Sequence, residues 1–530
     1  MSYIFKQATL NHEYKQIHKL NYETFVEEIP QHEANDHFEL IDTYHNNNTY
    51  LLALKDGDLV GMLAINENRP FSLDKKIGPV EHCLPCPAEY ICEIRLLSVK
   101  KKYRNGRVFF GLAQLLAQYC LTHQYDTGII SGTIHQLKLY KQIGFTPFAN
   151  LVGTEEAQYQ PMYMTRDSFL ASAAGRFAKP TISFLPGPVQ NQSELNEAIS
   201  RPTVSHRHPS FLKRFSKAKK ALSELTRSKY TQILLGTGTL ANDVIAAQLK
   251  ILDGKGLILI NGEFGERLVN HATRAGLHFK TIHQKYGEPF CYSKLKEDIS
   301  EFDWIWAVHT ETSTGMINDM DSLKILAQHH RAKLCLDCIS SIGAIPLNLE
   351  DIYLAAGTSG KALGSLSGLS FVFHNHQAKP NQKIPSYLDL GMYDQHSTPF
   401  SHSSSLIEGL LHVLEVPSHI RENKLLTNYN ELIRCAKQNQ LDVLCPDSSR
   451  SSFIITIPFP ESANSFHIGL CMENHGYLIH YASDYLQKNN WIQLSTLNIH
   501  NVSCIEPMMD YLKKFIDYEI KWSDTVTTNT

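Results

Sequence analysis

The sequence predicts an α/β protein with two domains, a smaller α+β domain followed by a larger domain built on a mainly parallel sheet. Three observations support this class. The chain has 530 residues, and domains usually hold roughly 100 to 200. An antiparallel hairpin is predicted within residues 50–65. Apolar strands then alternate with helices between residues 232 and 338, which is typical of a parallel sheet covered by helices.

The first domain begins with apolar runs of strand length. Residues 50–54 and 59–65 are separated by the turn Lys55-Asp-Gly-Asp58, and residues 91–99 form a further strand. An amphipathic helix follows, because apolar residues recur with helical spacing at Val108, Phe109, Leu112, Leu115, Leu116 and Tyr119. We therefore expect a sheet whose third strand leads through a glycine-containing turn into a helix.

The boundary between the domains is expected where the two patterns meet. A polar helix and a connector rich in small residues end at Pro180, and the turn Pro186-Gly-Pro188 follows. We assign residues 1–170 to the first domain, 171–181 to a linker and 182–525 to the second domain. The second domain should have a mainly parallel sheet and, after about residue 405, a small α+β subdomain.

Composition and charge exclude several classes of protein. Hydrophobic residues make up 43% and charged residues 19%, as in packed globular proteins. The formal charge of -3 gives no field for nucleic acid, and no apolar run is long enough for a signal peptide or a membrane span. We expect a cytoplasmic protein that binds small molecules.

The eleven cysteines do not have the density of a disulfide scaffold. Two CxxC spacings, Cys83 with Cys86 and Cys335 with Cys338, could each form half of a zinc site. Neither spacing has a second half elsewhere in the sequence, so no metal site is predicted.

Polar segments follow several of the predicted parallel strands, where α/β sheets place their ligand sites. Thr237, Gly238 and Thr239 open a helix and could bind a phosphate, although such turns are also ordinary helix caps. Asp337 ends another strand and could either pair with a protonated pyridine nitrogen or cap a helix. Lys361 lies in Gly-Thr-Ser-Gly-Lys, a setting that is unusual for a surface lysine.

Together these segments resemble the class V aminotransferases, which are fold-type I pyridoxal-phosphate enzymes. The branch that holds alanine-glyoxylate and 2-aminoethylphosphonate-pyruvate aminotransferases is most similar. The resemblance rests on Leu185-Pro-Gly-Pro188, Ser205-His-Arg-His-Pro209, His309 to Gly315, and Asp337-Cys-Ile-Ser-Ser-Ile-Gly343. It implies a mainly parallel, seven-stranded type of sheet in the second domain. It also implies a homodimer that moves an amino group between an amine or amino acid and a 2-oxo acid, with pyridoxal 5'-phosphate as cofactor.

The resemblance also implies roles for single residues. Lys361 would form the Schiff base with the cofactor and act as general acid and base, and Asp337 would pair with the ring nitrogen. The remaining cofactor contacts would be Phe264 and Ile339 on the two faces of the ring, Thr312 near the ring hydroxyl, Thr237, Gly238, Thr239 and Thr358 at the phosphate, and Thr398 from the neighbouring subunit.

One position departs from the family pattern. Gln493 occupies the place of the arginine that binds the substrate carboxylate, and an amide cannot offer a charged, planar fork. Arg207 is a candidate to replace that arginine. The alternative is a lyase or decarboxylase that keeps the cofactor.

The first domain resembles the GNAT acyltransferases. Arg104, Asn105, Gly106 and Arg107 match the turn that binds acyl-CoA or an acyl carrier protein, although Val108 stands where a second glycine is usual. Tyr140, in Leu139-Tyr-Lys-Gln-Ile-Gly-Phe145, matches the general acid near the leaving thiolate. Residues 18–29 are also similar to the enzymes that take long acyl chains, but helix packing explains their apolar residues equally well.

Glu93 could deprotonate an acceptor amine, or it could simply pair with Arg95. The sequence thus predicts an aminotransferase fused to an N-acyltransferase. In the alternative, the first domain is a degenerate module that senses an acyl ligand and regulates the second.

Overall fold

The computed structural model describes residues 3–29, 31–154, 157–189, 193–298 and 302–523. Two compact units are formed by contacts within the chain. The first contains described residues of Met1–Ile182, Pro460–Leu478 and Lys514–Thr530, and the second those of Ser183–Phe459 and Ile479–Lys513. Two segments from late in the sequence therefore belong to the first unit, which the sequence did not indicate.

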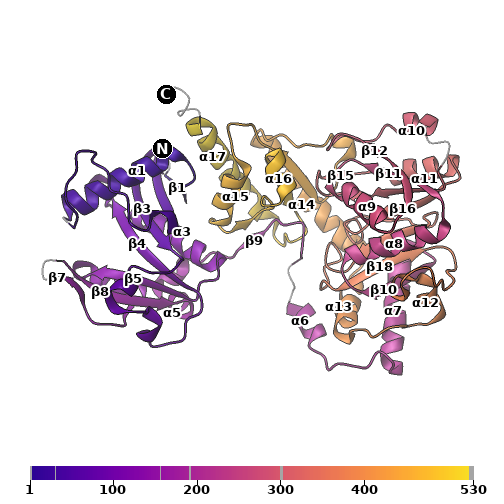
Figure 1. Cartoon of the computed structure of the whole chain (residues 1–530), viewed down its shortest axis with the longest axis horizontal. Helices are drawn as coiled ribbons and strands as arrows, with labels where there is room; N and C mark the ends of the chain where they lie inside the picture. Colours follow the sequence, from indigo (N-terminus) through magenta and orange to yellow (C-terminus); the bar gives the residue numbers. More distant parts are fainter. Residues whose placement is uncertain (1–2, 30, 155–156, 190–192, 299–301, 524–530) are drawn as a thin grey trace. The chain divides into compact units, whose positions relative to one another are not determined.

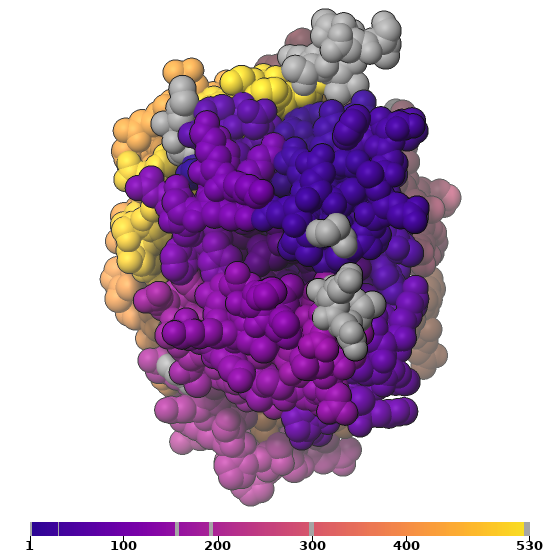
Figure 2. Space-filling model, turned by 90° about the vertical axis from the view of Figure 1, so that its left-hand side faces the viewer, coloured from indigo at the N-terminus to yellow at the C-terminus, as the bar shows by residue number. Residues whose placement is uncertain are grey.

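An eight-stranded sheet organises the first unit (Figure 1). Its strands run in the order β1-β2-β3-β4-β5-β8-β6, with β7 paired to β8. The strands are β1 (Ile4–Gln7), β2 (Asn48–Lys55), β3 (Asp58–Asn66), β4 (Ile91–Val99), β5 (Thr127–Thr133), β6 (Thr146–Pro147), β7 (Val152–Thr154) and β8 (Ala157–Thr165). The helices are α1 (Asn11–Tyr22), η1 (Glu23–Glu28), α2 (Asp74–Ile77), α3 (Arg107–Thr122), α4 (Leu137–Ile143), α5 (Arg166–Ala171) and α15 (Ser465–Glu473). Figure 2 shows a face of this unit, on which indigo residues of the early segments meet purple residues from later ones.

The predicted hairpin between β2 and β3 is present. Lys55 pairs with Asp58, so Asp56 and Gly57 form a two-residue turn. Both have positive φ, 55° and 90°, as the turn that matches strand twist requires. The Trp522 ring packs so closely on Gly57 that an added Cβ would lie 1.9 Å from its Cζ2 atom. A side chain at position 57 would therefore displace this ring.

Strands β4 and β5 pair for only part of their length. Their parallel register runs from Ile91 to Ile94, where Ile94 faces Ile130, while β4 continues to Val99. The chain bulges just beyond this point, since Leu96 has a φ of 54°. The β5-facing edge of β4 after Ile94 thus has no partner in this register.

A charged cluster ties the part of α17 (Ile505–Ser523) that begins at Lys514 into the core of the first unit. Lys6 Nζ donates to Glu13 at 2.7 Å, and Tyr518 Oη donates to the same carboxylate at 2.9 Å. The side chains of Lys6 and Glu13 are 1% and 0% exposed. A buried charge without its partners is costly. Tyr518 is therefore part of the core of the first unit, where it donates to the buried Glu13 carboxylate.

The second unit contains a seven-stranded sheet in the order β10-β18-β17-β16-β13-β11-β12. Neighbouring strands are parallel except at β18, which is antiparallel to β10 and β17. The strands are β10 (Tyr230–Leu235), β11 (Lys255–Ile260), β12 (His278–His283), β13 (Trp304–Val308), β16 (Lys333–Asp337), β17 (Leu354–Thr358) and β18 (Leu369–His374). The predicted fold class is confirmed.

Helices cover both faces of this sheet, and each face has its own apolar core. One core joins the sheet to α7 (Pro209–Thr226), α11 (Met320–His329) and α13 (Ser404–Leu414). The other joins it to α8 (Gly238–Leu252), α9 (Glu263–Arg274) and α12 (Leu390–Gln395). The sheet is therefore buried on both sides, as its continuous apolar strands require.

The other elements are shorter or lie outside the large sheet. They are β9 (Ile182–Ser183), α6 (Ser193–Ile199), α10 (Tyr292–Asp298), β14 (Thr310–Glu311), β15 (Met316–Ile317), α14 (Ser418–Gln438), β19 (Ile454–Pro458), β20 (Tyr477–Leu478), α16 (Asp484–Asn489) and β21 (Trp491–Ser495). Strands β19 and β21 form the antiparallel sheet of the expected small subdomain. Strand β20 pairs with β9, and His480 forms an isolated antiparallel bridge with Gln493 of β21. Among the described helices, none combines the length and apolarity needed to cross a membrane.

Replacing Tyr518 with alanine should destabilise the first unit. The change leaves a cavity in its core and removes one donor to the buried Glu13 carboxylate. We expect the free energy of unfolding to fall by about 3 kcal/mol, which thermal unfolding would show as a lower midpoint. Lys521→Ala changes an exposed residue of the same helix and is the control. Equal midpoints for the two variants would contradict the packing described above.

Candidate active site

The candidate active site lies at the carboxyl ends of the parallel strands of the second unit. Asp337 is the last residue of β16, Thr358 is the last of β17, and Lys361 follows three residues later. Since β16 and β17 are paired in parallel, both strands end at the same edge of the sheet. Parallel pairing thus brings together residues that are far apart in sequence.

The Asp337 carboxylate is buried and is held by neutral donors. Asn242 Nδ2 donates to Asp337 Oδ2 at 2.8 Å, and the Ile339 amide donates to Oδ1 at 2.9 Å. Burial raises the pKa of Asp337, although these donors and the charge of Lys361 oppose the effect. Among the described residues, no ion-pair partner within 4.0 Å of Asp337 is found. The site therefore offers a buried anion to a cationic group of a ligand.

Lys361 is partly buried, and its charge acts on the Asp337 carboxylate. Its Nζ donates to Ser340 Oγ at 2.9 Å and lies 5.2 Å from the centroid of the Phe264 ring. Burial lowers the pKa of Lys361, while the negative charge of Asp337 acts in the opposite direction. A lowered pKa increases the fraction of neutral amine, which is the nucleophilic form.

The predicted phosphate residues stand at the start of α8. Thr237 is the residue before the helix, its hydroxyl makes no capping hydrogen bond, and Thr237 and Thr239 are exposed. Gly238 packs against Ile339, where an added Cβ would lie 2.8 Å from Ile339 Cδ1. Thr358 differs from these residues, because its buried hydroxyl donates to the Leu369 carbonyl at 3.0 Å.

Gln493 is buried and all of its hydrogen-bonding groups are used. Its amide nitrogen donates to the Thr312 carbonyl and to Thr456 Oγ1, the latter at 2.9 Å. Its Oε1 lies 2.8 Å from Tyr485 Oη, which donates to it, and 3.0 Å from His480 Nδ1. The side chain therefore fixes the residues around it and has nothing left for a substrate.

Two predicted residues are not joined to this cluster by any contact among the described residues. Arg207 is exposed before α7, and its Nε atom lies 3.4 Å from His206 Nε2. Thr398 lines a small cavity with Tyr387 and His402.

Sequence reasoning missed several polar residues near Lys361. Glu311 is fully buried and accepts hydrogen bonds from the backbone amides of Phe264 and Gly265 at the start of α9, at 3.3 and 3.0 Å. Asn242 lies one helical turn after Gly238, a spacing that could have marked it. Ser340 lies in the segment 337–343 that carries the resemblance, but the resemblance implied no role for it. His480 and Arg267 left no comparable signal, because their positions depend on how separate segments pack.

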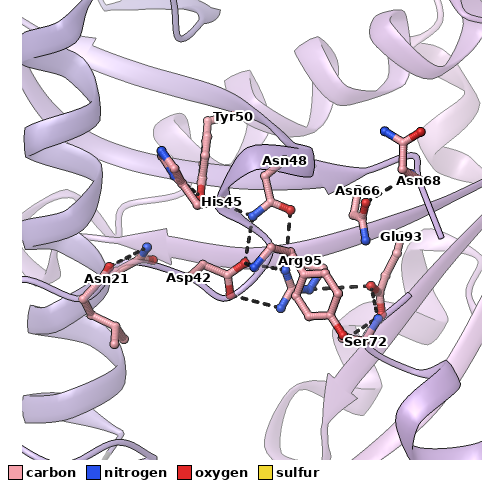
Figure 3. Close-up of polar contacts among 12 residues, drawn as sticks. Asn21, Asp42, His45, Asn48, Tyr50, Asn66, Asn68, Ser72, Glu93 and Arg95 are labelled. Atoms are coloured by element: carbon pink, nitrogen blue, oxygen red, sulfur yellow. Dashed lines mark hydrogen bonds and ion pairs between the residues drawn. The ribbon is translucent and has the colours of Figure 1, made fainter. Parts of the chain in front are cut away.

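A polar cluster in the first unit surrounds Arg95 (Figure 3). The Arg95 guanidinium donates to both oxygens of Asp42, at 2.7 and 3.1 Å. Glu93 is buried, accepts from the Ser72 amide at 2.7 Å and lies 3.6 Å from Arg95. Although burial opposes it, the bonds from Arg95 hold the pKa of the Asp42 carboxyl below its ordinary value. Glu93 thus pairs with Arg95, as the second interpretation of the sequence expected.

The predicted carrier-binding turn precedes α3. Gly106 has a φ of 89°, the Arg107 amide donates to Asn105 Oδ1 at 3.2 Å, and the Arg107 side chain is exposed. Arg104 is occupied, because Glu28 accepts from its guanidinium through both carboxylate oxygens. Val108 points into the core towards Gly61 and is completely buried. This valine therefore does not cover the turn.

Tyr140 is half-buried in α4. It packs over Gly132, where an added Cβ would lie 2.9 Å from the ring, and forms an edge-to-face pair with Phe145. Burial raises the pKa of Tyr140, opposed by a hydrogen bond with Thr133. The phenol therefore stays protonated at neutral pH.

All eleven cysteines are free thiols, including the buried pair Cys335 and Cys338. In the described part of the chain, no three His, Cys, Asp or Glu side chains are grouped so that they could hold a metal ion.

Comparisons with known proteins agree with this division of the chain. Residues 14–145 match the acetyltransferase (GNAT) family, and residues 189–399 match the class-V aminotransferase family. A 2-aminoethylphosphonate–pyruvate transaminase of Pseudomonas putida is 31% identical over 170 residues, which cover 31% of this chain and 46% of the relative. Another, from Pseudomonas putida strain W619, is 27% identical over 263 residues, which cover 46% and 71%. The chain spans about half the length of the first of these relatives.

A solved structure supports the fold of the second unit. Pyridoxamine-pyruvate aminotransferase from Mesorhizobium loti superposes with a TM-score of 0.59 at 20% identity, covering 66% of this chain and 97% of that one. The expected fold-type I architecture is confirmed, with a GNAT-family region before it.

Replacing Asp337 with asparagine should stabilise the protein purified without cofactor. Wild type carries a buried carboxylate whose raised pKa means that stability falls as pH rises above the ordinary value of 3.8. The amide removes this charge, and Asn242 can turn its unpartnered Oδ1 towards it. We expect the free energy of unfolding to rise by an amount on the order of 1 kcal/mol at neutral pH, and thermal unfolding measures this gain. The gain should shrink as pH is lowered towards 3.8, and a gain that is independent of pH would contradict the assignment.

Proposed function

We propose that this chain, which joins a GNAT-family region to a class-V aminotransferase region, moves an amino group between an amine or amino acid and a 2-oxo acid with pyridoxal 5'-phosphate. The observation that carries the proposal is the set of three residues at one sheet edge: Lys361, the buried Asp337 and the ring of Phe264. A nucleophilic amine, an anion for a ring nitrogen and an aromatic surface are the groups that this cofactor needs.

The residues present fit the cofactor. Asp337 would bind the ring nitrogen, because its buried charge has only neutral donors. Phe264 and Ile339 would cover the ring, and Thr312 would lie near its hydroxyl. Thr237, Gly238 and Thr239 offer a helix start to the phosphate. Thr358 would have to give up its bond to Leu369 before its hydroxyl could donate there.

Protein groups would control the proton transfers, while the bound cofactor supplies an electron sink for the reacting carbon. Lys361 Nζ would take the proton from the substrate carbon and return it, since burial favours its neutral form. Ser340 Oγ, 2.9 Å from Nζ, holds this nitrogen in place. Asp337 would keep the ring nitrogen protonated, which strengthens the electron sink.

We propose 2-aminoethylphosphonate as the amine and pyruvate as the oxo acid, because the relatives are 2-aminoethylphosphonate–pyruvate transaminases. A second candidate is a lyase or decarboxylase that uses the same residues. Gln493 favours this candidate. It occupies the position of the expected arginine, and its amide offers no charged, planar fork to bind a substrate carboxylate.

For the first unit we propose N-acyl transfer from acyl-CoA or an acyl carrier protein. The unpaired edge of β4 after Ile94 and the turn at Gly106 support a bound carrier, and the protonated Tyr140 supports a general acid. The alternative is a degenerate ligand-sensing module, favoured by the pairing of Arg104 with Glu28. We also propose a cytoplasmic homodimer, in which Thr398 serves the neighbouring site. Eleven free thiols support a reducing compartment.

Borohydride reduction of the protein with bound cofactor should attach the cofactor covalently to Lys361. Peptide mass spectrometry locates the label, and Lys361→Ala should lose both the label and transamination. Lys379→Ala, which changes an exposed lysine of the same unit, is the control and should keep both. Labelling of another lysine would overturn the assignment.

Acyl transfer by the full chain should release a free thiol from acyl-CoA when an amine acceptor is present. Tyr140→Phe should slow this release by roughly tenfold to a hundredfold, because the general acid is lost. Transamination should stay unchanged in the same preparation. If wild type and Tyr140→Phe release thiol equally, Tyr140 is not the acid; if neither releases any, the sensing alternative gains support.

A further inference from the structure

The acidic group of a substrate would need a cation in the candidate active site, and Gln493 does not supply one. Both ends of the Gln493 amide are already hydrogen-bonded within the protein. His480, next to it, is also occupied: Nδ1 lies 3.0 Å from Gln493 and Nε2 lies 2.6 Å from Ser483 Oγ. Burial lowers the pKa of His480, so it is neutral at physiological pH.

Arg267 meets the need from helix α9. Its guanidinium carbon lies 4.7 Å from the centroid of the Phe264 ring, and Lys361 Nζ lies 5.2 Å from the same centroid. The guanidinium and the reactive amine are therefore no more than about 10 Å apart. Burial is the main cause of the lowered pKa of Lys361, and the positive charge of Arg267 lowers that pKa further. Arg267 thus lies on the ring that borders the reacting centre.

The Arg267 guanidinium is available to a ligand. Its side chain is 58% exposed, and its ion-pair contact, with Glu263, is long at 3.9 Å. Two other arginines of this unit already donate to backbone carbonyls, although Nη1 of the buried Arg421 has no hydrogen-bond partner among the described residues. Arg450 donates to the Cys445 carbonyl at 2.7 Å, and Arg421 donates to the Val413 carbonyl at 3.1 Å. Planar donors on an exposed arginine suit a phosphonate, sulfonate or carboxylate.

We propose that Arg267 determines substrate specificity by binding an acidic group that the amine substrate carries beyond its reacting carbon. The inference rests on the proposed aminotransferase function. It selects primary amines with a short spacer and a terminal phosphonate, sulfonate or carboxylate over neutral amines. With bonds of about 1.5 Å and a charged hydrogen bond of about 2.8 Å, a spacer of two or three carbons stays within the upper limit of about 10 Å between the two groups.

A panel of amines tests the inference on the cofactor-loaded full chain. The panel contains 2-aminoethylphosphonate, taurine, β-alanine and the neutral ethanolamine, with pyruvate as acceptor. Arg267→Gln should raise KM for the acidic amines by about tenfold to a hundredfold and leave ethanolamine unchanged, because only a charge-assisted bond is lost. Arg267→Lys should recover part of the loss. Arg274→Gln, on the same helix and paired with Asn270, is the matched control.

Binding of methylphosphonate, measured by calorimetry with the cofactor-loaded protein, gives a readout without turnover. Wild type and Arg274→Gln should bind it, and Arg267→Gln should bind it at least about tenfold more weakly. An equal effect of Arg267→Gln on ethanolamine and the acidic amines, or unchanged methylphosphonate affinity, would overturn the inference. If wild type converts no amine, the proposed function fails, and the calorimetric comparison still decides whether Arg267 binds the anion.

Discussion

The burial of the Asp337 carboxylate is the constraint around which the second unit is arranged. A charge inside a protein is costly unless it is compensated, and here only an asparagine amide and a backbone amide donate to it. The residue can occupy this position because β16 ends there, with neighbouring strands on both sides that bring Lys361 close. Packing of the apolar sheet therefore offsets the cost of holding an anion where a ligand can use it.

Sequence patterns predicted the parts of the fold that depend on local rules. The alternation of strands and helices predicted the parallel sheet, and the polar residues after the strands pointed to Asp337 and Lys361, which the structure places at one edge of that sheet. The pairing of segments cannot be read in this way. Gln493 looked like a substrate residue by position, whereas the structure makes it a bridge between Thr312, Thr456, His480 and Tyr485. That role depends on two strands and a helix that converge only in three dimensions.

The first unit shows how a departure from a motif can be harmless at one position and informative at another. Val108 replaces a small residue, but its side chain fills the core above Gly61. Arg104 keeps the expected residue type, yet its charge is taken by Glu28. The sequence motif therefore identifies the residue types of the turn, and only the contacts in the structure show whether their side chains are free to bind a ligand.

The contribution of α17 to the first unit has a consequence for biosynthesis. Tyr518 and Trp522 complete a core that contains Ile17, Leu52 and Leu54, but the ribosome makes them only after residues 183–513. The early strands of this unit therefore reach their final packing only after the second unit has been synthesised. Until Tyr518 has been made, the ion pair of Lys6 and Glu13 lacks its third member, and the apolar surface that Tyr518 and Trp522 cover stays exposed, as is common in folding intermediates of multidomain chains.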